Sequence, residues 1–164
     1  MIPYVLKSIF IILLVVGTVT DLKSRLLPNK LTVSGIAFGL IIHVTESILL
    51  SSISPIIDSA AGLFACGGFL FLVAFVSKGG MGMGDVKFSA MIGAYLGFKY
   101  GIIALFTAII LGGAFGLILI ALKKATRKTA VPFGPFLALG SVAAVFFESP
   151  INNLIQGLIK QPFG

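Results

Sequence analysis

Two of the five acidic residues in this 164-residue chain lie where an apolar stretch meets a basic segment. Asp21 ends the first apolar stretch, and Asp85 precedes a later one. Two carboxylates that share a site cannot both ionise cheaply, so one holds a proton while the other acts as a base. Such a pair can activate water for attack on a peptide carbonyl, and its titration belongs to the pair.

Each aspartate taken alone also has an ordinary structural role. Asp85 is suited to cap the N-terminus of the helix that follows it, and Asp21 can compensate the positive charge of the segment after it. A shared site requires that the helices carrying the two residues meet at the same depth. Gly82 and Gly84 support that interpretation, because glycine permits positive φ and lets a substrate strand approach closely.

The composition is that of a membrane protein. Hydrophobic residues make up 58% of the chain and charged residues 10%, whereas roughly a quarter of an ordinary soluble domain is charged. This excludes a soluble enzyme, and it excludes disorder, which needs low hydrophobicity and high charge. The single cysteine, Cys66, excludes a disulfide framework and a multi-cysteine zinc site.

The apolar stretches predict an all-α, polytopic bundle of six transmembrane helices that forms a single domain over residues 1–164. The predicted spans are Pro3–Thr20, Leu31–Leu50, Pro55–Ser77, Val86–Lys99, Ile102–Leu122 and Phe133–Phe147. The fourth is short, at about 21 Å of helical rise. It is either a span that neighbouring protein covers or a half-helix that lines a cavity.

The basic residues predict the orientation. With six spans, nine lysines and arginines fall in loops on one side and three on the other. By the positive-inside rule the first side is cytoplasmic, so both termini lie on the outer side of the membrane. The net charge of +7 therefore indicates anionic lipid headgroups rather than nucleic acid as the partner. Asp21 and Asp85 fall on the cytoplasmic side.

The remaining polar residues near the outer side allow a different function. His43 and Glu46 share a helix face, and with Asp58 they could form the proton relay of a small transporter or channel. One histidine and one carboxylate are too few for a catalytic zinc, which usually takes three protein ligands. We therefore expect a paired, inward-facing hydrogen bond between His43 and Glu46.

Three pairs of glycines lie four residues apart within spans, which lets neighbouring helix backbones approach closely. The pairs are Gly35/Gly39, Gly93/Gly97 and Gly112/Gly116. Packing within one bundle and homo-oligomerisation both fit this spacing.

Three segments resemble the type IV prepilin peptidases. Gly82–Lys87 resembles the Gly-x-Gly-Asp motif of aspartic membrane proteases, with the Val-Lys continuation of that family. Asp21, followed by Arg25, Pro28 and Asn29, is similar to the family's first aspartate motif, with Leu27 in place of isoleucine. Residues 132–136, Pro-Phe-Gly-Pro-Phe, resemble a segment at the entry to the family's last helix.

The resemblance implies an aspartic endopeptidase of the cytoplasmic membrane that removes the short basic leader of prepilins or pseudopilins before their hydrophobic helix. Asp21 and Asp85 would be the catalytic pair, with neither metal nor cofactor. The residues that would shape the active-site loop and the substrate approach are Gly82, Gly84, Lys87, Pro28 and Asn29.

Many bacterial members of the family carry an N-terminal region with paired cysteines and methylate the new N-terminus. This chain has only Cys66 and opens on the first span, so we expect peptidase activity without methyl transfer. A presenilin-like protease, which cuts within a transmembrane helix by the same chemistry, is the alternative enzyme.

Overall fold

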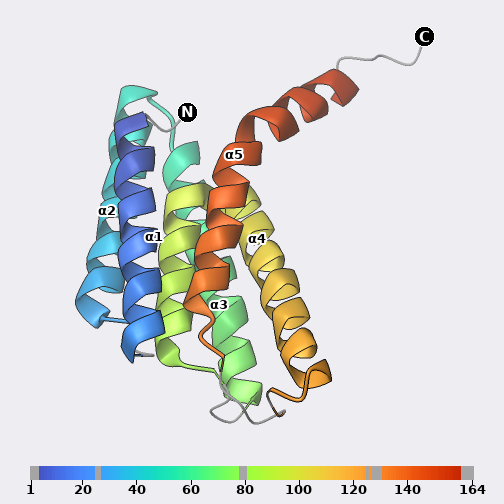
Figure 1. Ribbon diagram of the computed structural model, residues 1–164. Coiled ribbons are helices and arrows are strands. Elements are labelled where there is room, and N and C mark those ends of the chain that lie inside the picture. The colour runs from blue at the N-terminus through green and yellow to red at the C-terminus, as the bar shows by residue number, and fades with distance from the viewer. Residues whose placement is uncertain (1–3, 25–26, 78–80, 125, 127–130, 160–164) are drawn as a thin grey trace.

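The described residues form five α-helices in the computed structural model (Figure 1). The structure describes residues 4–24, 27–77, 81–124, 126 and 131–159, with side chains described between residues 7 and 147 of these ranges. The helices are α1 (Tyr4–Ser24), α2 (Asn29–Leu49), α3 (Ser54–Val76), α4 (Met83–Ala121) and α5 (Gly134–Ile159). The prediction of an all-α protein is confirmed.

Helix α4 consists of two arms that meet at Gly97. This residue has φ 71° and ψ −176°, which is not helical, and the chain reverses direction there (Figure 1). A positive φ is readily adopted only by glycine. The predicted spans Val86–Lys99 and Ile102–Leu122 thus correspond to arms 83–96 and 98–121, but a single residue replaces the expected loop between them.

Side chains from α2 and α3 satisfy the backbone groups that the break leaves without helical partners. The Asp58 carboxylate accepts a hydrogen bond of 3.2 Å from the N–H of Phe98. On the other side of the break, the Ser59 hydroxyl donates to the carbonyl of Ala94 at 2.7 Å. His43 Nε2 lies 3.2 Å from the carbonyl oxygen of Tyr95.

His43 and Glu46 lie side by side, as their spacing predicts, but the expected hydrogen bond is absent, because His43 Nδ1 has no hydrogen-bond partner among the described residues. His43 is buried, and its Nδ1 lies 3.4 Å from Oε2 of Glu46. The residues of the alternative relay, His43, Glu46 and Asp58, are therefore all involved in contacts at or beside the break in α4.

The arm 83–96 forms the centre of the bundle. Phe88, Met91, Ile92 and Tyr95 are almost wholly buried, and the Tyr95 ring stacks on Phe10 of α1 with centroids 4.6 Å apart. Because other helices surround this arm, it does not need the length of a lipid-facing span.

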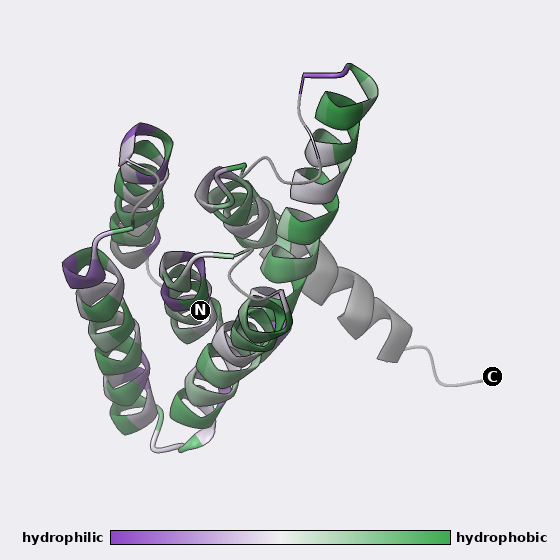
Figure 2. Cartoon of the chain, turned by 90° about the horizontal axis from the view of Figure 1, so that it is seen from below, coloured by the Kyte–Doolittle hydropathy of each residue, from purple (hydrophilic) through white to green (hydrophobic). Residues whose placement is uncertain are grey.

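The outer surface is apolar. Large hydrophobic side chains are exposed on all five helices, and hydrophobic colouring covers most of the helical ribbon in Figure 2. Helices α2, α3 and α4 are long and apolar enough to cross a bilayer, judged by length and composition. The architecture fits an integral membrane protein.

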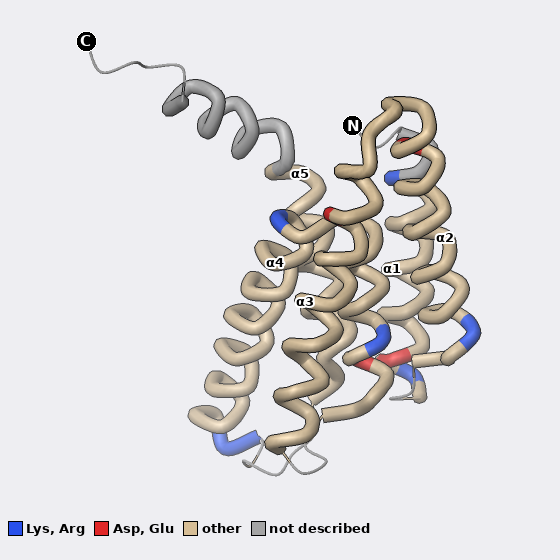
Figure 3. The backbone as a smooth tube through the Cα atoms, turned by 180° about the vertical axis from the view of Figure 1, so that it is seen from behind, with Lys and Arg blue, Asp and Glu red and all other residues tan. Residues whose placement is uncertain are grey.

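The described charged residues gather at the two ends of the bundle (Figure 3). This separation leaves an apolar band between the ends, as a membrane requires. Several basic residues used to predict the orientation lie outside the described residues, namely Arg25, Lys78, Arg127, Lys128 and Lys160.

Candidate active site

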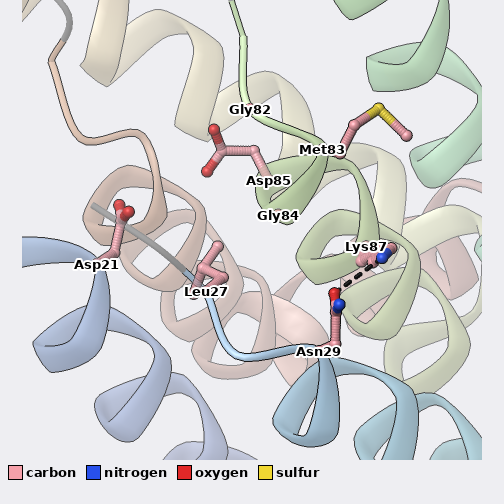
Figure 4. A pocket seen from close by; sticks show the side chains of 8 residues that line it. All are labelled: Asp21, Leu27, Asn29, Gly82, Met83, Gly84, Asp85 and Lys87. Atoms are coloured by element: carbon pink, nitrogen blue, oxygen red, sulfur yellow. Dashed lines mark hydrogen bonds between the residues drawn. The ribbon is translucent and has the colours of Figure 1, made fainter. Parts of the chain in front are cut away.

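A pocket of about 470 Å³ lies at the end of the bundle where α1 ends and α4 begins. Asp21 and Asp85 face one another across it, although 63 intervening residues separate them in the chain (Figure 4). The residues lining the pocket are Asp21, Leu27, Asn29, Gly82, Met83, Gly84, Asp85 and Lys87. The fold thus brings together the two carboxylates that the sequence placed at the same depth.

Asp21 lies in the last turn of α1 and is only 5% exposed. Its Oδ2 accepts a hydrogen bond of 2.9 Å from the backbone N–H of Gly134, the first residue of α5. The first N–H groups of a helix have no intrahelical acceptor, so Asp21 supplies one for α5. A Cβ at residue 134 would lie 2.7 Å from Oδ2 of Asp21, which explains the need for glycine at this contact.

Asp85 is the third residue of α4 and lies ahead of its apolar stretch. The N-cap is Gly82, so the N-cap position considered for Asp85 is wrong. Burial, and secondarily the nearby Asp21 carboxylate, raise the pKa of Asp85 from 3.8 to about 6, against an opposing hydrogen bond from the Gly82 backbone. The pair is therefore suited to hold one proton near neutral pH.

The expectation of positive φ at Gly82 and Gly84 is wrong. Gly82 has an extended backbone with φ −74° and ψ 141°, and Gly84 lies within α4. Gly84 instead allows close packing, because a Cβ there would lie 3.0 Å from Cβ of Leu27. At Gly82 the nearest atom to such a Cβ would be Oδ2 of Asp85, at 3.6 Å, so Gly82 keeps the pocket open beside this carboxylate.

Lys87 and Asn29 close one side of the pocket. Lys87 Nζ donates a hydrogen bond of 2.8 Å to Oδ1 of Asn29, which ties the start of α4 to the start of α2 (Figure 4). Pro28 is not among the lining residues. It is the N-cap of α2, and its carbonyl accepts hydrogen bonds from the N–H groups of Leu31 and Thr32. Pro28 thus fixes the start of the helix whose first residue is Asn29.

Sequence reasoning did not assign a site role to Leu27, Met83 or Gly134. Leu27 and Met83 line the pocket, and Gly134 contacts Asp21. All three belong to motif segments recognised in the sequence, but nothing in those segments shows that residue 134 meets residue 21. That contact depends on how α1 and α5 pack.

The sequence pattern of the type IV leader peptidase family matches residues 8–117, which include both aspartates and the whole pocket lining. The chain belongs to this family. No solved structure gave a significant match to the chain.

Curated relatives in the family are similar over most of this chain. It is 32% identical to the prepilin leader peptidase/N-methyltransferase of Bacillus subtilis, over 95% of this chain and 60% of the relative. It is 36% identical to the protein of the same name from Legionella pneumophila, over 84% of this chain and 48% of the relative. The family member described here thus spans about half to three fifths of the length of these relatives.

Proposed function

We propose that this chain is a membrane-embedded aspartic endopeptidase that cleaves the leader of prepilin or pseudopilin precursors. The observation that carries the proposal is the approach of Asp21 and Asp85 from two different helices to one pocket. Membership of the type IV leader peptidase family supports the choice of substrate.

The raised pKa of Asp85 suggests which carboxylate carries the proton. In this mechanism Asp21 takes a proton from water while the water oxygen bonds to the scissile carbonyl carbon. Asp85 gives its proton to the carbonyl oxygen. When the tetrahedral intermediate collapses, the C–N bond breaks, and Asp21 passes its proton to the leaving amine. Asp85 recovers a proton from the new carboxyl group, which completes the cycle without net change in either aspartate.

The proposal includes a membrane arrangement with six crossings and both termini on the outer side. The two arms of α4 would count as separate crossings, the first of them shielded by the other helices. The pocket would then lie at the cytoplasmic face, beside anionic headgroups, and the chain would act as one domain over residues 1–164.

The position of the pair favours cleavage beside the membrane over cleavage deep within it. Asp21 lies in the last turn of α1 and Asp85 in the first turn of α4, so the reaction occurs at the end of the bundle. A precursor with a basic leader and an apolar helix places its scissile bond at that level. Two further expectations stay predictions: that the chain does not methylate the new N-terminus, and that cleavage needs no cofactor.

The decisive experiment replaces each aspartate by asparagine, which keeps the shape and removes the titratable group. Asp21→Asn and Asp85→Asn, each coexpressed with a prepilin, should reduce leader removal on a gel at least a hundredfold. The matched control is Asp58→Asn, at the opposite end of the bundle, and membrane abundance is measured for all three variants. Near-normal processing by either pocket variant would overturn the two-carboxylate mechanism.

A further inference from the structure

An apolar groove of about 340 Å³ runs between α1 and α5. It is lined by Ile11, Leu14, Val15, Thr18, Val19, Pro135, Ala138, Leu139 and Val142. The groove begins beside the candidate active site, because Thr18 is three residues before Asp21 and Pro135 follows Gly134. The helices that form its walls are thus the ones joined by the Asp21–Gly134 hydrogen bond.

The chemistry of the groove suits an apolar helix. Val15 and Leu139 are more than half exposed, at 55% and 56%, and together with neighbouring aliphatic side chains they leave a large hydrophobic surface. From Ile11 to Val19 the groove follows α1 for about 12 Å, which is roughly two helical turns. Within lipid, close van der Waals packing of a second helix against this surface would stabilise the complex.

One polar group in the groove has no partner among the described residues. The Thr18 hydroxyl oxygen is shielded from solvent and makes no hydrogen bond there. It lies about one turn from the level of Asp21. The first turn of any helix carries N–H groups without intrahelical acceptors. Because the Thr18 oxygen is shielded, the side chain would change its rotamer to accept a hydrogen bond from such a turn.

We propose that this groove binds the first two turns of the substrate's apolar helix. The inference rests on the proposed function, since a precursor cleaved just before its helix must direct that helix away from the pocket along the bundle. The groove lies next to the pocket on the side of Asp21, since Thr18 and Pro135 of its lining are close in the chain to Asp21 and Gly134, and it provides such a path. Docking there would align the extended leader across the pocket towards Asp85.

Disulfide trapping tests the proposal. Val15→Cys and Leu139→Cys are each combined with Asp85→Asn, which removes turnover, and with a precursor carrying one cysteine in the second turn of its apolar helix. The native Cys66 is fully buried and does not compete. The matched control is Ile12→Cys, on the same helix and 60% exposed but outside the groove. We expect at least fivefold more enzyme–precursor disulfide at the two groove positions.

A second measurement uses the active enzyme. Leu139→Trp should raise KM for the full-length precursor about tenfold by occupying the groove, while Ile12→Trp should leave KM unchanged. Equal trapping at all three positions, together with an unchanged KM in Leu139→Trp, would show that the groove is not the docking site. Disulfides that form only between two enzyme chains, and none with the precursor, would also overturn the proposal. The disulfide yield is measured in the Asp85→Asn background, and leader cleavage is measured separately with the unaltered enzyme. A wrong docking site is therefore distinguishable from a wrong peptidase function.

Discussion

Gly134 donates its backbone N–H to Oδ2 of Asp21 at 2.9 Å, a contact between residues 113 positions apart. The hydrogen bond fixes the Asp21 carboxylate at the edge of the pocket that also contains Asp85. It also ties the end of α1 to the start of α5. The start of α5 therefore belongs to the geometry of the site without lining the pocket.

The first prediction concerns this contact. In Gly134→Ala the new methyl group would approach Oδ2 of Asp21 to 2.7 Å, so the carboxylate must move. Displacement of a reacting group by about 1 Å can cost up to a hundredfold in rate. We expect kcat for leader cleavage to fall 10- to 100-fold, with a smaller change in KM. Gly68→Ala, where a Cβ meets nothing within 4 Å, is the control. A kcat for Gly134→Ala equal to that of the control would contradict the positioning role.

The second prediction concerns stability and pH. The pKa of Asp85 is raised to about 6 in the folded chain from 3.8, so the folded state binds this proton more tightly than the unfolded state. The stabilisation that comes from this tighter proton binding is fully present below pH 3.8. It is lost as the pH rises through about 6, where Asp85 ionises in the folded chain. Asp85→Asn removes the cost of the buried charge. It should raise the free energy of unfolding by about 1–2 kcal/mol at pH 8, a value reduced for partial exposure.

Thermal unfolding in detergent between pH 4 and pH 8 measures this effect. The gain in Tm for Asp85→Asn should be largest at pH 8 and shrink towards pH 4. A gain that does not depend on pH would show that the substitution acts through packing rather than through the charge.

The third prediction concerns the break in α4. Gly97 has φ 71°, and any side chain there would collide with the Asp58 carboxylate. We expect Gly97→Ala to lower the free energy of unfolding by about 2–4 kcal/mol, from backbone strain and the displaced cap. Gly113→Ala, with open space around its Cβ, should be neutral or stabilising. Equal Tm values for the two variants would show that the break does not require glycine.

The fourth prediction separates the peptidase from the proton-relay alternative. Glu46 lies 3.4 Å from His43, and His43 contacts the carbonyl of Tyr95 at the break. Glu46→Gln should therefore reduce stability by about 1–2 kcal/mol while kcat for cleavage stays within about twofold. A selective loss of cleavage, at normal membrane abundance and normal Tm, would favour the relay.

The sequence predicted the helices well because hydrophobic stretches long enough for a bilayer have few alternatives to helix. From the length of the apolar stretches, it placed the boundary between the fourth and fifth predicted spans near Lys99. It did not locate the turn at Gly97, because that turn depends on caps supplied by Asp58 and Ser59 of another helix. Likewise, the two glycines before Asp85 suggested unusual backbone angles, whereas the structure uses Gly84 for contact with Leu27.

By itself, the sequence determined the membrane character, the all-helical class and the two aspartates as candidate catalytic residues. Charge, hydropathy and spacing along the chain are sufficient for those conclusions. Only the tertiary structure decided that Gly134 orients Asp21, that Lys87 binds Asn29, and that an apolar groove leads away from the pocket. The physical reason is that each of these features joins helices distant in sequence, and their relative positions follow from the packing of the whole bundle.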